Sequence, residues 1–502
     1  MHRISLDGES MTLETLARVA LDFAPVELAG KARQRVLASR AVIDRALDSN
    51  LPVYGVTTGF GKLSDVRIPQ DEIRQLQLNL LRSHACGAGE PLAEPEVRAA
   101  ILLRANSLAK GFSGVRPEII DMLIAVLNKR VCPVVPSRGS VGASGDLVPS
   151  AHMALALIGE GEAFYRRERL PGSAALQLAG LSPLELQAKE GLSLLNGTQF
   201  MTAVGGLVIE RARSLMDTAD VAASLTLEVL LGSVVADDSR IHQVRPHPGQ
   251  QKTAAHITRM LRNSAIVESH RDCGRIQDAY SLRCVPQVHG AVRDGLDHVR
   301  EILTREMNSA TDNPLVFADG GAILAGGNFH GAPVGYALDY AALLLADLAS
   351  ISERRLERLV NPDLSGMPAF LSPSPGLSSG YMMLQVMVAS LVSENKILAH
   401  PASVDSIPTS GNKEDHVSMG MTAALKLRSV ADNLEIVLAA EILAACQGME
   451  FRKPLEPGEG TRKAYALVRQ AIEPLANDRD SSPDIEILRQ LIRRGSFVEL
   501  LA

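Results

Sequence analysis

Long stretches of the chain carry apolar residues at the three- and four-residue spacing of amphipathic helices. Each stretch must bury its apolar stripe, so several of them in one chain predict a helical bundle. They exceed the length of an average globular helix, which also favours packing across subunits. The predicted long helices cover residues 197–231, 286–306, 332–360, 378–398 and 417–447.

The first part of the chain has a different pattern, in which shorter helical stretches alternate with loops rich in glycine and proline. Strand signals are sparse and short. We therefore predict a mainly α protein with an N-terminal domain at residues 1–196 and a long-helix bundle domain at residues 197–502. The shorter helices are expected over residues 12–50, 71–82, 95–109, 116–129 and 147–158, and a loop with short strands over residues 51–65.

Composition narrows the class of protein. The 502 residues are 46% hydrophobic, which is enough for a large core, and a net charge of -6 argues against a nucleic-acid surface. Five cysteines without a CxxC pair indicate neither a disulfide framework nor a zinc ribbon, and they fit a reducing cytoplasm. The start "MHRISLDGES" does not read as a signal peptide, and the apolar run "YALDYAALLLADLASISERRLERL" carries acids, so no membrane span is expected. The sequence contains no HExxH motif or comparable spacing of metal ligands, so we expect no metal site.

The stretch "GSVGASGD" at residues 139–146 places a glycine at every third position. A dinucleotide fingerprint requires G-x-G-x-x-G in a β-α-β unit, and a P-loop ends in GK[ST], whereas Asp146 follows the last glycine here. A tight surface turn is the ordinary interpretation. A third interpretation is that Ala143-Ser144-Gly145 closes on itself.

In that third interpretation the Gly145 nitrogen attacks the Ala143 carbonyl carbon. Loss of two waters, one carrying the Ser144 hydroxyl oxygen, leaves a conjugated imidazolone with an exposed methylidene. Glycine provides an unhindered nitrogen and the necessary backbone freedom, and serine provides the hydroxyl that is eliminated. A neighbouring acid such as Asp146 can assist the proton transfers.

Other candidate residues are scattered along the chain, and taken singly each has an ordinary structural interpretation. Tyrosines are usually core residues with a bonded hydroxyl, an arginine is usually a surface ion pair, and "KEDH" is typical of a solvated helix start. "QDAYSLRC" places three of the candidates at helical spacing on one face. The candidates are Tyr54, His84, Asn196, Gln277, Tyr280, Arg283, Phe329 and Glu414.

Considered together, these stretches resemble one family, the aromatic amino-acid ammonia-lyases. The motifs that carry the resemblance follow one another in order over nearly the whole chain. They are "VYGVTTGFGKLSD", "LNLLRSHACGAGEP", "GSVGASGDL", "KEGLSLLNGTQ", "QDAYSLRCVPQVHGA", "ATDNPLVF", "GGNFH", "LVSENKILAHPASVDSIPTS" and "NKEDHVSMG". The resemblance implies the long-helix bundle of the ammonia-lyase/fumarase-like superfamily, with a smaller N-terminal part that carries the glycine loop.

The resemblance also implies the chemistry. Ala143-Ser144-Gly145 is expected to form 4-methylideneimidazole-5-one (MIO), without pyridoxal phosphate. The implied roles are Tyr280 as the base for the β-proton, Arg283 as the carboxylate ligand and Tyr54 in proton transfer at the leaving amine. Asn196 and Gln277 are expected to donate hydrogen bonds to MIO and carboxylate, and Phe329 to pack beside the MIO. A homotetramer with each active site assembled from three subunits is implied as well.

Two positions favour L-histidine as the substrate, with trans-urocanate and ammonia as products. The selectivity position reads Ser83-His84, where phenylalanine and tyrosine lyases typically carry Phe-Leu or His-Leu, and Glu414 stands where those lyases typically carry glutamine. Lys413 and Ser150 depart from the family pattern without replacing a residue given a role. A phenylalanine or tyrosine lyase or an aminomutase stays the nearest alternative, and a non-catalytic helical scaffold and a pyridoxal-phosphate lyase are more distant ones.

Overall fold

The computed structural model of the protein describes residues 3–49, 53–274 and 276–501. It is mainly helical, as predicted, with four small sheets among the described residues. The chain divides into two compact units, each assembled from three segments. Unit 1 comprises Met1–Glu210, Arg300–Asp339 and Pro401–Leu425, and unit 2 comprises Arg211–Val299, Tyr340–His400 and Lys426–Ala502. The domain boundary that the sequence placed after residue 196 stays a prediction.

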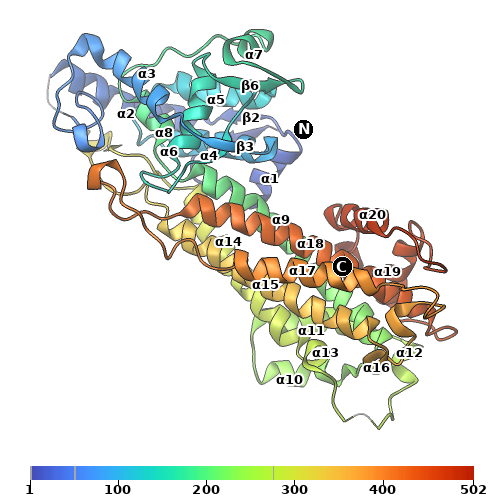
Figure 1. Cartoon of the computed structure of the whole chain (residues 1–502). Helices are drawn as coiled ribbons and strands as arrows, with labels where there is room; N and C mark the ends of the chain where they lie inside the picture. Colours follow the sequence, from blue (N-terminus) through green and yellow to red (C-terminus); the bar gives the residue numbers. More distant parts are fainter. Residues whose placement is uncertain (1–2, 50–52, 275, 502) are drawn as a thin grey trace. The chain divides into compact units, whose positions relative to one another are not determined.

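The long helices confirm the apolar periodicity to within a few residues (Figure 1). The largest differences are at the start of α17, four residues later than predicted, and at both ends of α18, each three residues later. The most apolar window of α15 is long and apolar enough for a membrane span, but 67% of that window is buried inside the protein, as in the core helix of a soluble protein. The five helices are α9 (Gln199–Val229), α14 (Val285–Met307), α15 (Ala332–Val360), α17 (Met382–Leu398) and α18 (Gly420–Glu450).

In unit 1 a set of shorter helices surrounds α4 (Glu94–Ala109), almost all of which is buried. Pro95 stands in its first turn, where its missing N–H is harmless, and Glu96 accepts a hydrogen bond from the Ala93 N–H. The other helices of this unit are α1 (Leu13–Leu21), α2 (Gly30–Asp48), α3 (Ile73–His84), α5 (Pro117–Lys129), α6 (Leu147–Leu157), α7 (Gly172–Leu178) and α8 (Glu190–Leu195).

Two expectations for this region are wrong. Residues 12–50 do not form one helical stretch, because Phe23 has a positive φ of 56° and a short strand, β2 (Val26–Leu28), separates α1 from α2. The expected short strands between residues 53 and 65 are replaced by turns and the 3-10 helix η1 (Gly61–Leu63). Residues 51 and 52 of that loop lie outside the described residues. The strands of unit 1 pair as β1 (Ile4–Leu6) with β2, β3 (Ala88–Pro91) with β5 (Pro136–Arg138), β4 (Cys132–Pro133) with β6 (Glu162–Tyr165) and β7 (Glu168–Pro171), and β8 (Leu315–Val316) with β9 (Ile323–Leu324).

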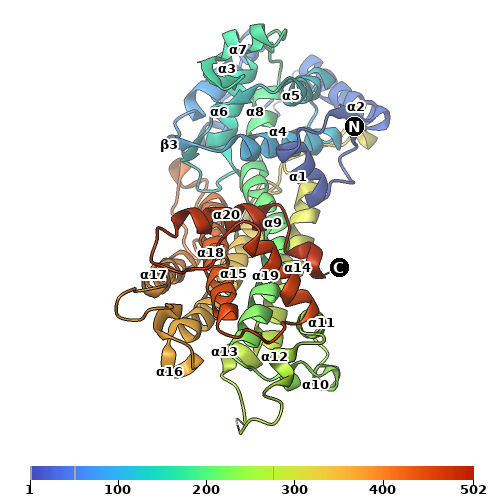
Figure 2. The ribbon, with the colours of Figure 1, turned by 90° about the vertical axis from the view of Figure 1, so that its right-hand side faces the viewer.

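In unit 2 the segments of α9, α14, α15 and α18 run side by side (Figures 1 and 2). A buried ionic network joins them. Glu441 of α18 accepts two hydrogen bonds from Arg355 of α15, at 2.5 and 2.9 Å, and one from Thr226 of α9 at 2.8 Å. Every charge here has a partner, which a buried charge requires. Unit 2 also holds α10 (Ser239–Gln243), α11 (Pro248–Met260), α12 (Ala265–Glu268), α13 (Tyr280–Arg283), α16 (Pro362–Ser365), α19 (Glu459–Arg469) and α20 (Ser482–Arg493).

Asp217, Asp220 and His256 of the same network are close enough together to suggest a metal site. These side chains already make hydrogen bonds to one another and to neighbouring residues, however. Asp220 accepts from His256, His289 and Arg293 at 2.7–2.8 Å, and Asp217 accepts from Arg293 at 2.7 Å. Burial alone raises the pKa of Asp220, but these hydrogen bonds and charges outweigh it and lower the pKa. We therefore interpret the cluster as a structural ion-pair network.

Candidate active site

The glycine loop lies between β5 and α6 and has an unusual backbone. Gly142, Ser144 and Gly145 all have positive φ, at 79°, 51° and 81°. A positive φ at serine is uncommon, because the left-handed region crowds the Cβ atom. The Gly145 N–H donates to the Gly142 carbonyl at 3.3 Å, so the tripeptide is folded back on itself.

A second glycine closes the loop from the other side. The Gly197 N–H donates to the Ser144 carbonyl at 3.1 Å, and the Asp146 N–H donates to the Gly197 carbonyl at 2.8 Å. A Cβ atom on Gly145 would lie 2.2 Å from the Gly197 oxygen, so no side chain fits there. The close approach of these two backbones explains why the loop needs glycine at position 145.

Arg104 of α4 holds the segment that presents Gly197. Its guanidinium is fully buried and donates to the carbonyls of Ser193, Leu195 and Asn196 at the C-terminal end of α8. Burial lowers the pKa of Arg104 to about 10, against the opposing charges of Asp312 and Asp146, so the side chain is cationic at neutral pH. A cation at this end of a helix satisfies carbonyls that have no partner within the helix.

Asn196 follows the last residue of α8 as its C-cap. The next helix, α9, begins at Gln199, two residues later than predicted. The Asn196 amide nitrogen donates to Asp312 at 3.3 Å and to the Asn313 carbonyl at 2.8 Å. Asp312 in turn accepts from the buried Lys189 ammonium at 2.8 Å. The side chain is therefore held by a buried ion pair next to the glycine loop.

Asp146 is fully buried at the end of the glycine loop. Its carboxylate accepts from the Ser140 hydroxyl at 3.0 Å and from the Met201 N–H at 2.7 Å. Burial raises the pKa of Asp146 to about 6, although its hydrogen bonds and the Arg104 charge oppose the rise. A carboxyl group with this pKa can both take up and release a proton near neutral pH.

Glu414 contacts the glycine loop directly. The Ser144 hydroxyl donates to Glu414 Oε1 at 3.1 Å, and the Thr409 hydroxyl donates to Glu414 Oε2 at 2.9 Å. The structural interpretation of "KEDH" as a helix start is wrong, because Glu414 follows the 3-10 helix η6 (Ser410–Asn412) and α18 begins only at Gly420. The carboxylate therefore has no capping role and faces the predicted reactive tripeptide.

His84 is the last residue of α3. Its Nδ1 lies 2.9 Å from the Leu80 carbonyl, which can only accept, so Nδ1 carries a proton and Nε2 of the neutral ring is an acceptor. Burial lowers the pKa of His84, against the hydrogen bond to Leu80 and the negative charge of Glu414. The effect of Glu414 shows that the two predicted specificity residues lie within electrostatic reach of each other.

Tyr54 and Phe329 lie on segments that adjoin the Glu414 loop. The Tyr54 hydroxyl accepts from the Gly61 N–H at 3.3 Å, and a Cβ atom on Gly61 would lie 3.0 Å from the Ser410 hydroxyl. Phe329 is half-buried, and the ring of the next residue, His330, stacks on His416 with centroids 5.9 Å apart. Tyr54, His84, Asn196, Phe329 and Glu414 thus belong to the same compact unit as the glycine loop.

The other three predicted residues, Gln277, Tyr280 and Arg283, belong to unit 2, where Tyr280 and Arg283 are in contact. The Arg283 guanidinium lies 4.7 Å from the ring centroid of Tyr280, and Tyr280 is 71% exposed. Among the described residues, the buried Arg283 Nε has no hydrogen-bond partner. Gln277 does not share their helical face, because the chain is irregular until α13 begins at Tyr280, so that prediction is wrong.

The motifs in the sequence did not identify Arg104, Lys189 or Asp312. Arg104 interrupts the apolar run "AAILLRANSLA", and a single arginine inside such a run is a signal for a buried charge with a fixed partner. "ATDNPLVF" was matched as a motif, but no role was given to its aspartate.

Comparisons with known proteins identify the family. A model of the aromatic amino acid lyase family matches residues 11–470. A histidine ammonia-lyase from Myxococcus xanthus is 56% identical over 500 residues, which cover 100% of this chain and 98% of that protein. The crystal structure of histidine ammonia-lyase from Trypanosoma cruzi superposes with a TM-score of 0.93 at 42% identity, covering 100% of this chain and 95% of that one. Tyrosine aminomutase from Streptomyces globisporus superposes with a TM-score of 0.94 at 38% identity, covering 99% and 98%. The chain belongs to the aromatic amino acid lyase family.

Proposed function

We propose that the protein is a histidine ammonia-lyase, which eliminates ammonia from L-histidine to give trans-urocanate, the first step of histidine degradation. The observation that carries the proposal is the contact of Glu414 with Ser144, with His84 within electrostatic reach. The full-length similarity to a histidine ammonia-lyase at 56% identity supports it.

The Ala143-Ser144-Gly145 tripeptide fits the formation of MIO. The folded-back backbone, the left-handed Ser144 and the absence of space for a side chain at Gly145 favour cyclisation. Asp146, with a pKa near neutrality, can move protons while two waters leave. Once formed, the group supplies an electrophilic methylidene carbon to the substrate amine.

The residues of the chain perform the remaining tasks of the elimination. The reaction removes a proton from Cβ, breaks the Cα–N bond and forms a carbon–carbon double bond. We assign removal of the Cβ proton to Tyr280, binding of the carboxylate to Arg283 and proton transfer at the leaving amine to Tyr54. We assign support of the MIO group and the carboxylate by hydrogen bonds to Asn196 and Gln277, and packing beside the tripeptide to Phe329.

His84 and Glu414 determine the preference for an imidazole ring. A neutral imidazole has one donor and one acceptor, and both must be satisfied when the ring leaves water. Glu414 can accept the donor hydrogen, and the two residues together give the pocket polar partners that a phenyl ring leaves unpaired. This argues against a phenylalanine or tyrosine lyase or an aminomutase. The 38% identity to a tyrosine aminomutase, against 56% to a histidine ammonia-lyase, agrees.

We further propose a cytoplasmic homotetramer in which three subunits contribute to each active site. Tyr280 is largely exposed in a single chain, whereas a catalytic base needs a partly desolvated environment to remove an unacidic proton. Large apolar side chains are also exposed on the long helices, which indicates an interface between subunits. On α15 and α17 these are Tyr336, Tyr340, Leu343, Met383, Val386 and Ile397.

One pair of measurements tests the proposed function. The intact mass of the purified protein should be lower than the mass calculated from its sequence by two waters. The Ser144→Ala variant should have the full mass calculated from its own sequence and should form no urocanate. Tyr280→Phe should keep the lowered mass and lose turnover, since it leaves the tripeptide unchanged. A fully active protein with an unmodified mass would falsify the assignment.

A further inference from the structure

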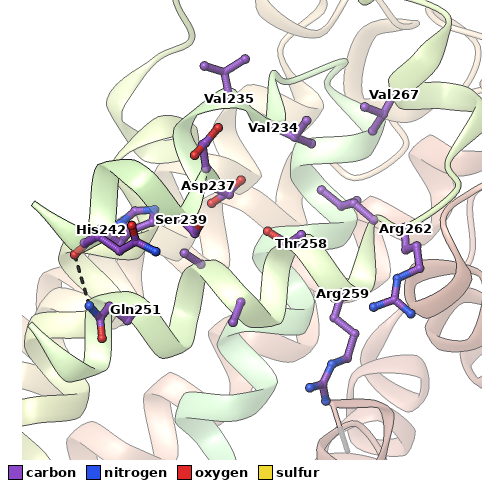
Figure 3. A pocket seen from close by; sticks show the side chains of 15 residues that line it. Val234, Val235, Asp237, Ser239, His242, Gln251, Thr258, Arg259, Arg262 and Val267 are labelled. Atoms are coloured by element: carbon purple, nitrogen blue, oxygen red, sulfur yellow. Dashed lines mark hydrogen bonds between the residues drawn. The ribbon is translucent and has the colours of Figure 1, made fainter. Parts of the chain in front are cut away.

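Unit 2 contains a cavity of about 990 Å³ that involves none of the residues assigned to the lyase reaction. It lies between η3 (Val234–Asp237), α10, α11 and the start of α12, and Figure 3 shows the side chains that line it. The wall is mixed, with Val234 and Val267 as apolar members and Thr258 and Arg262 as polar ones. Most of the lining residues are polar or charged, so the cavity suits a small polar ligand that also has an apolar part.

One polar atom in this wall, Asp237 Oδ2, has no partner within the described part of the chain. Asp237 is only 5% exposed, and its Oδ2 accepts no hydrogen bond from any described residue. The adjacent Asp238 shows the usual arrangement: it accepts from the Arg240 backbone N–H at 2.9 Å and from the Arg240 guanidinium at 2.9 and 2.6 Å. Buried acids without a partner are costly and uncommon outside functional sites.

The charged and titratable neighbours of Asp237 are occupied elsewhere. His242 of α10 uses both ring nitrogens, one toward the Ala236 carbonyl at 3.1 Å and one toward the Gln250 amide at 2.9 Å. His256 of α11 is bonded to Asp220 of α9, and Arg259 of α11 donates to the Leu501 carbonyl. Arg259 and Arg262 are both exposed, and the Arg262 guanidinium has no hydrogen-bond partner among the described residues.

We propose that this cavity binds a small zwitterion of the amino-acid class, with its ammonium group on Asp237 and its carboxylate on Arg262. The two groups come from different walls, Asp237 from η3 and Arg262 from the end of α11 (Figure 3). An aliphatic side chain of the ligand packs against Val234 and Val267. The site is independent of the proposed lyase function, since it shares no residue with it.

The ligand must change the protonation of Asp237. Burial, and after it the negative charge of Asp220, raises the pKa of Asp237 to about 8, so the carboxyl group is mostly neutral at pH 7. A bound ammonium group favours the ionised form and lowers that pKa. Binding at pH 7 therefore releases about one proton per ligand, and affinity rises as the pH approaches 8.

Calorimetric titration of the intact enzyme with L-valine, isobutylamine and isobutyrate tests the proposal. L-Valine should bind more tightly than the amine or the acid alone, and titrations in phosphate and in Tris should differ by the heat of about one proton. Asp237→Asn should weaken binding of L-valine by roughly tenfold or more and remove the difference between buffers. Arg262→Ala should weaken the binding of L-valine but leave the binding of isobutylamine unchanged.

Asp238→Asn is the matched control, because it removes an adjacent acid that already has its partner, and it should bind L-valine like the wild type. Equal binding by the Asp237→Asn and Asp238→Asn variants overturns the proposal, and so does the absence of binding by all three probes. Urocanate formation should be unchanged in both aspartate variants, which separates this test from that of the lyase function.

Discussion

At the scale of single residues, the proposed specificity depends on two side chains from positions 330 residues apart in sequence, His84 and Glu414. Glu414 accepts a hydrogen bond from Ser144, and its charge acts on His84. Glu414 caps no helix, but both of its oxygens accept hydrogen bonds, from Ser144 and Thr409, so a substrate ring must replace one of these bonds. His84 uses Nδ1 for its bond to Leu80, and its Nε2 has no hydrogen-bond partner among the described residues.

Exchange of these residues should change substrate choice. Glu414→Gln should sharply lower kcat/KM for L-histidine while the mass stays lowered by two waters, because the variant loses a charge but keeps the tripeptide. His84→Phe should lower use of L-histidine and admit some L-phenylalanine. Sites built on such polar contacts reject analogues that lack them by roughly 10⁴–10⁵. Steady-state kinetics with L-histidine, L-phenylalanine and L-tyrosine measure this, and better use of L-phenylalanine by the wild type would contradict it.

The raised pKa of Asp237 predicts that the free energy of unfolding depends on pH. Its pKa is raised from 3.8 to about 8, so the folded protein holds an extra proton between these values. Stability contributed by this group is complete below about pH 4 and falls with rising pH until about pH 8, by at most about 1.4 kcal/mol per pH unit.

Asp237→Asn should remove that slope. The difference between the Tm of the variant and the Tm of the wild type should therefore increase as the pH rises from 5 to 8. Asp238→Asn should show a constant difference over the same range, since hydrogen bonds from Arg240 lower the pKa of Asp238 to about 2. Parallel Tm curves for Asp237→Asn and the wild type would show that the carboxyl group ionises normally.

At the scale of elements, the end of α8 determines the shape of the glycine loop. Arg104 binds three carbonyls at this end, and the next residue in the chain, Gly197, bonds to both Ser144 and Asp146. Among the described residues the arginine makes no hydrogen bond to the tripeptide, so we regard it as a positioning residue. Its loss leaves buried carbonyls without partners, which costs about 1–3 kcal/mol for each group.

Arg104→Met should therefore reduce the fraction of protein whose mass is lowered by two waters, and Arg104→Lys should recover part of it. Mass spectrometry of the folded, soluble fraction measures this without any activity assay. The helix content by circular dichroism serves as the control for folding. Complete cyclisation in a folded Arg104→Met protein would show that the loop is held by Asp146 and Gly197 alone.

At the scale of the whole molecule, the predicted catalytic residues fall into two clusters in two compact units. If a site combines the tripeptide of one subunit with Tyr280 of another, two inactive variants should complement each other. Co-expression of Ser144→Ala with Tyr280→Phe should give mixed tetramers in which about one quarter of the sites carry both native residues. Urocanate formation should then reach roughly that fraction of the wild-type rate, whereas mixtures of the separately purified proteins stay inactive. No recovery in verified mixed tetramers would place the whole site within one subunit.

The sequence by itself determined the helical architecture and identified Ala143-Ser144-Gly145 as the candidate for cyclisation. Apolar periodicity is a local property, so α9, α14 and α15 were predicted to within two residues at either end. The chemistry of Ala143-Ser144-Gly145 likewise depends on residue types that are adjacent in the chain. The candidates Tyr54, His84 and Glu414 came from motifs, and each motif is a short continuous segment.

Only the tertiary structure decided which of these segments meet. The contact of Ser144 with Glu414 spans 270 residues, and the bonds from Arg104 to α8 span about 90, so no local pattern records them. The missing partner of Asp237 is likewise a result of packing, because its neighbour Asp238 has the same side chain and a complete set of hydrogen bonds. Burial and the competition for donors are properties of the folded chain, and they assign different pKa values to two adjacent, identical residues.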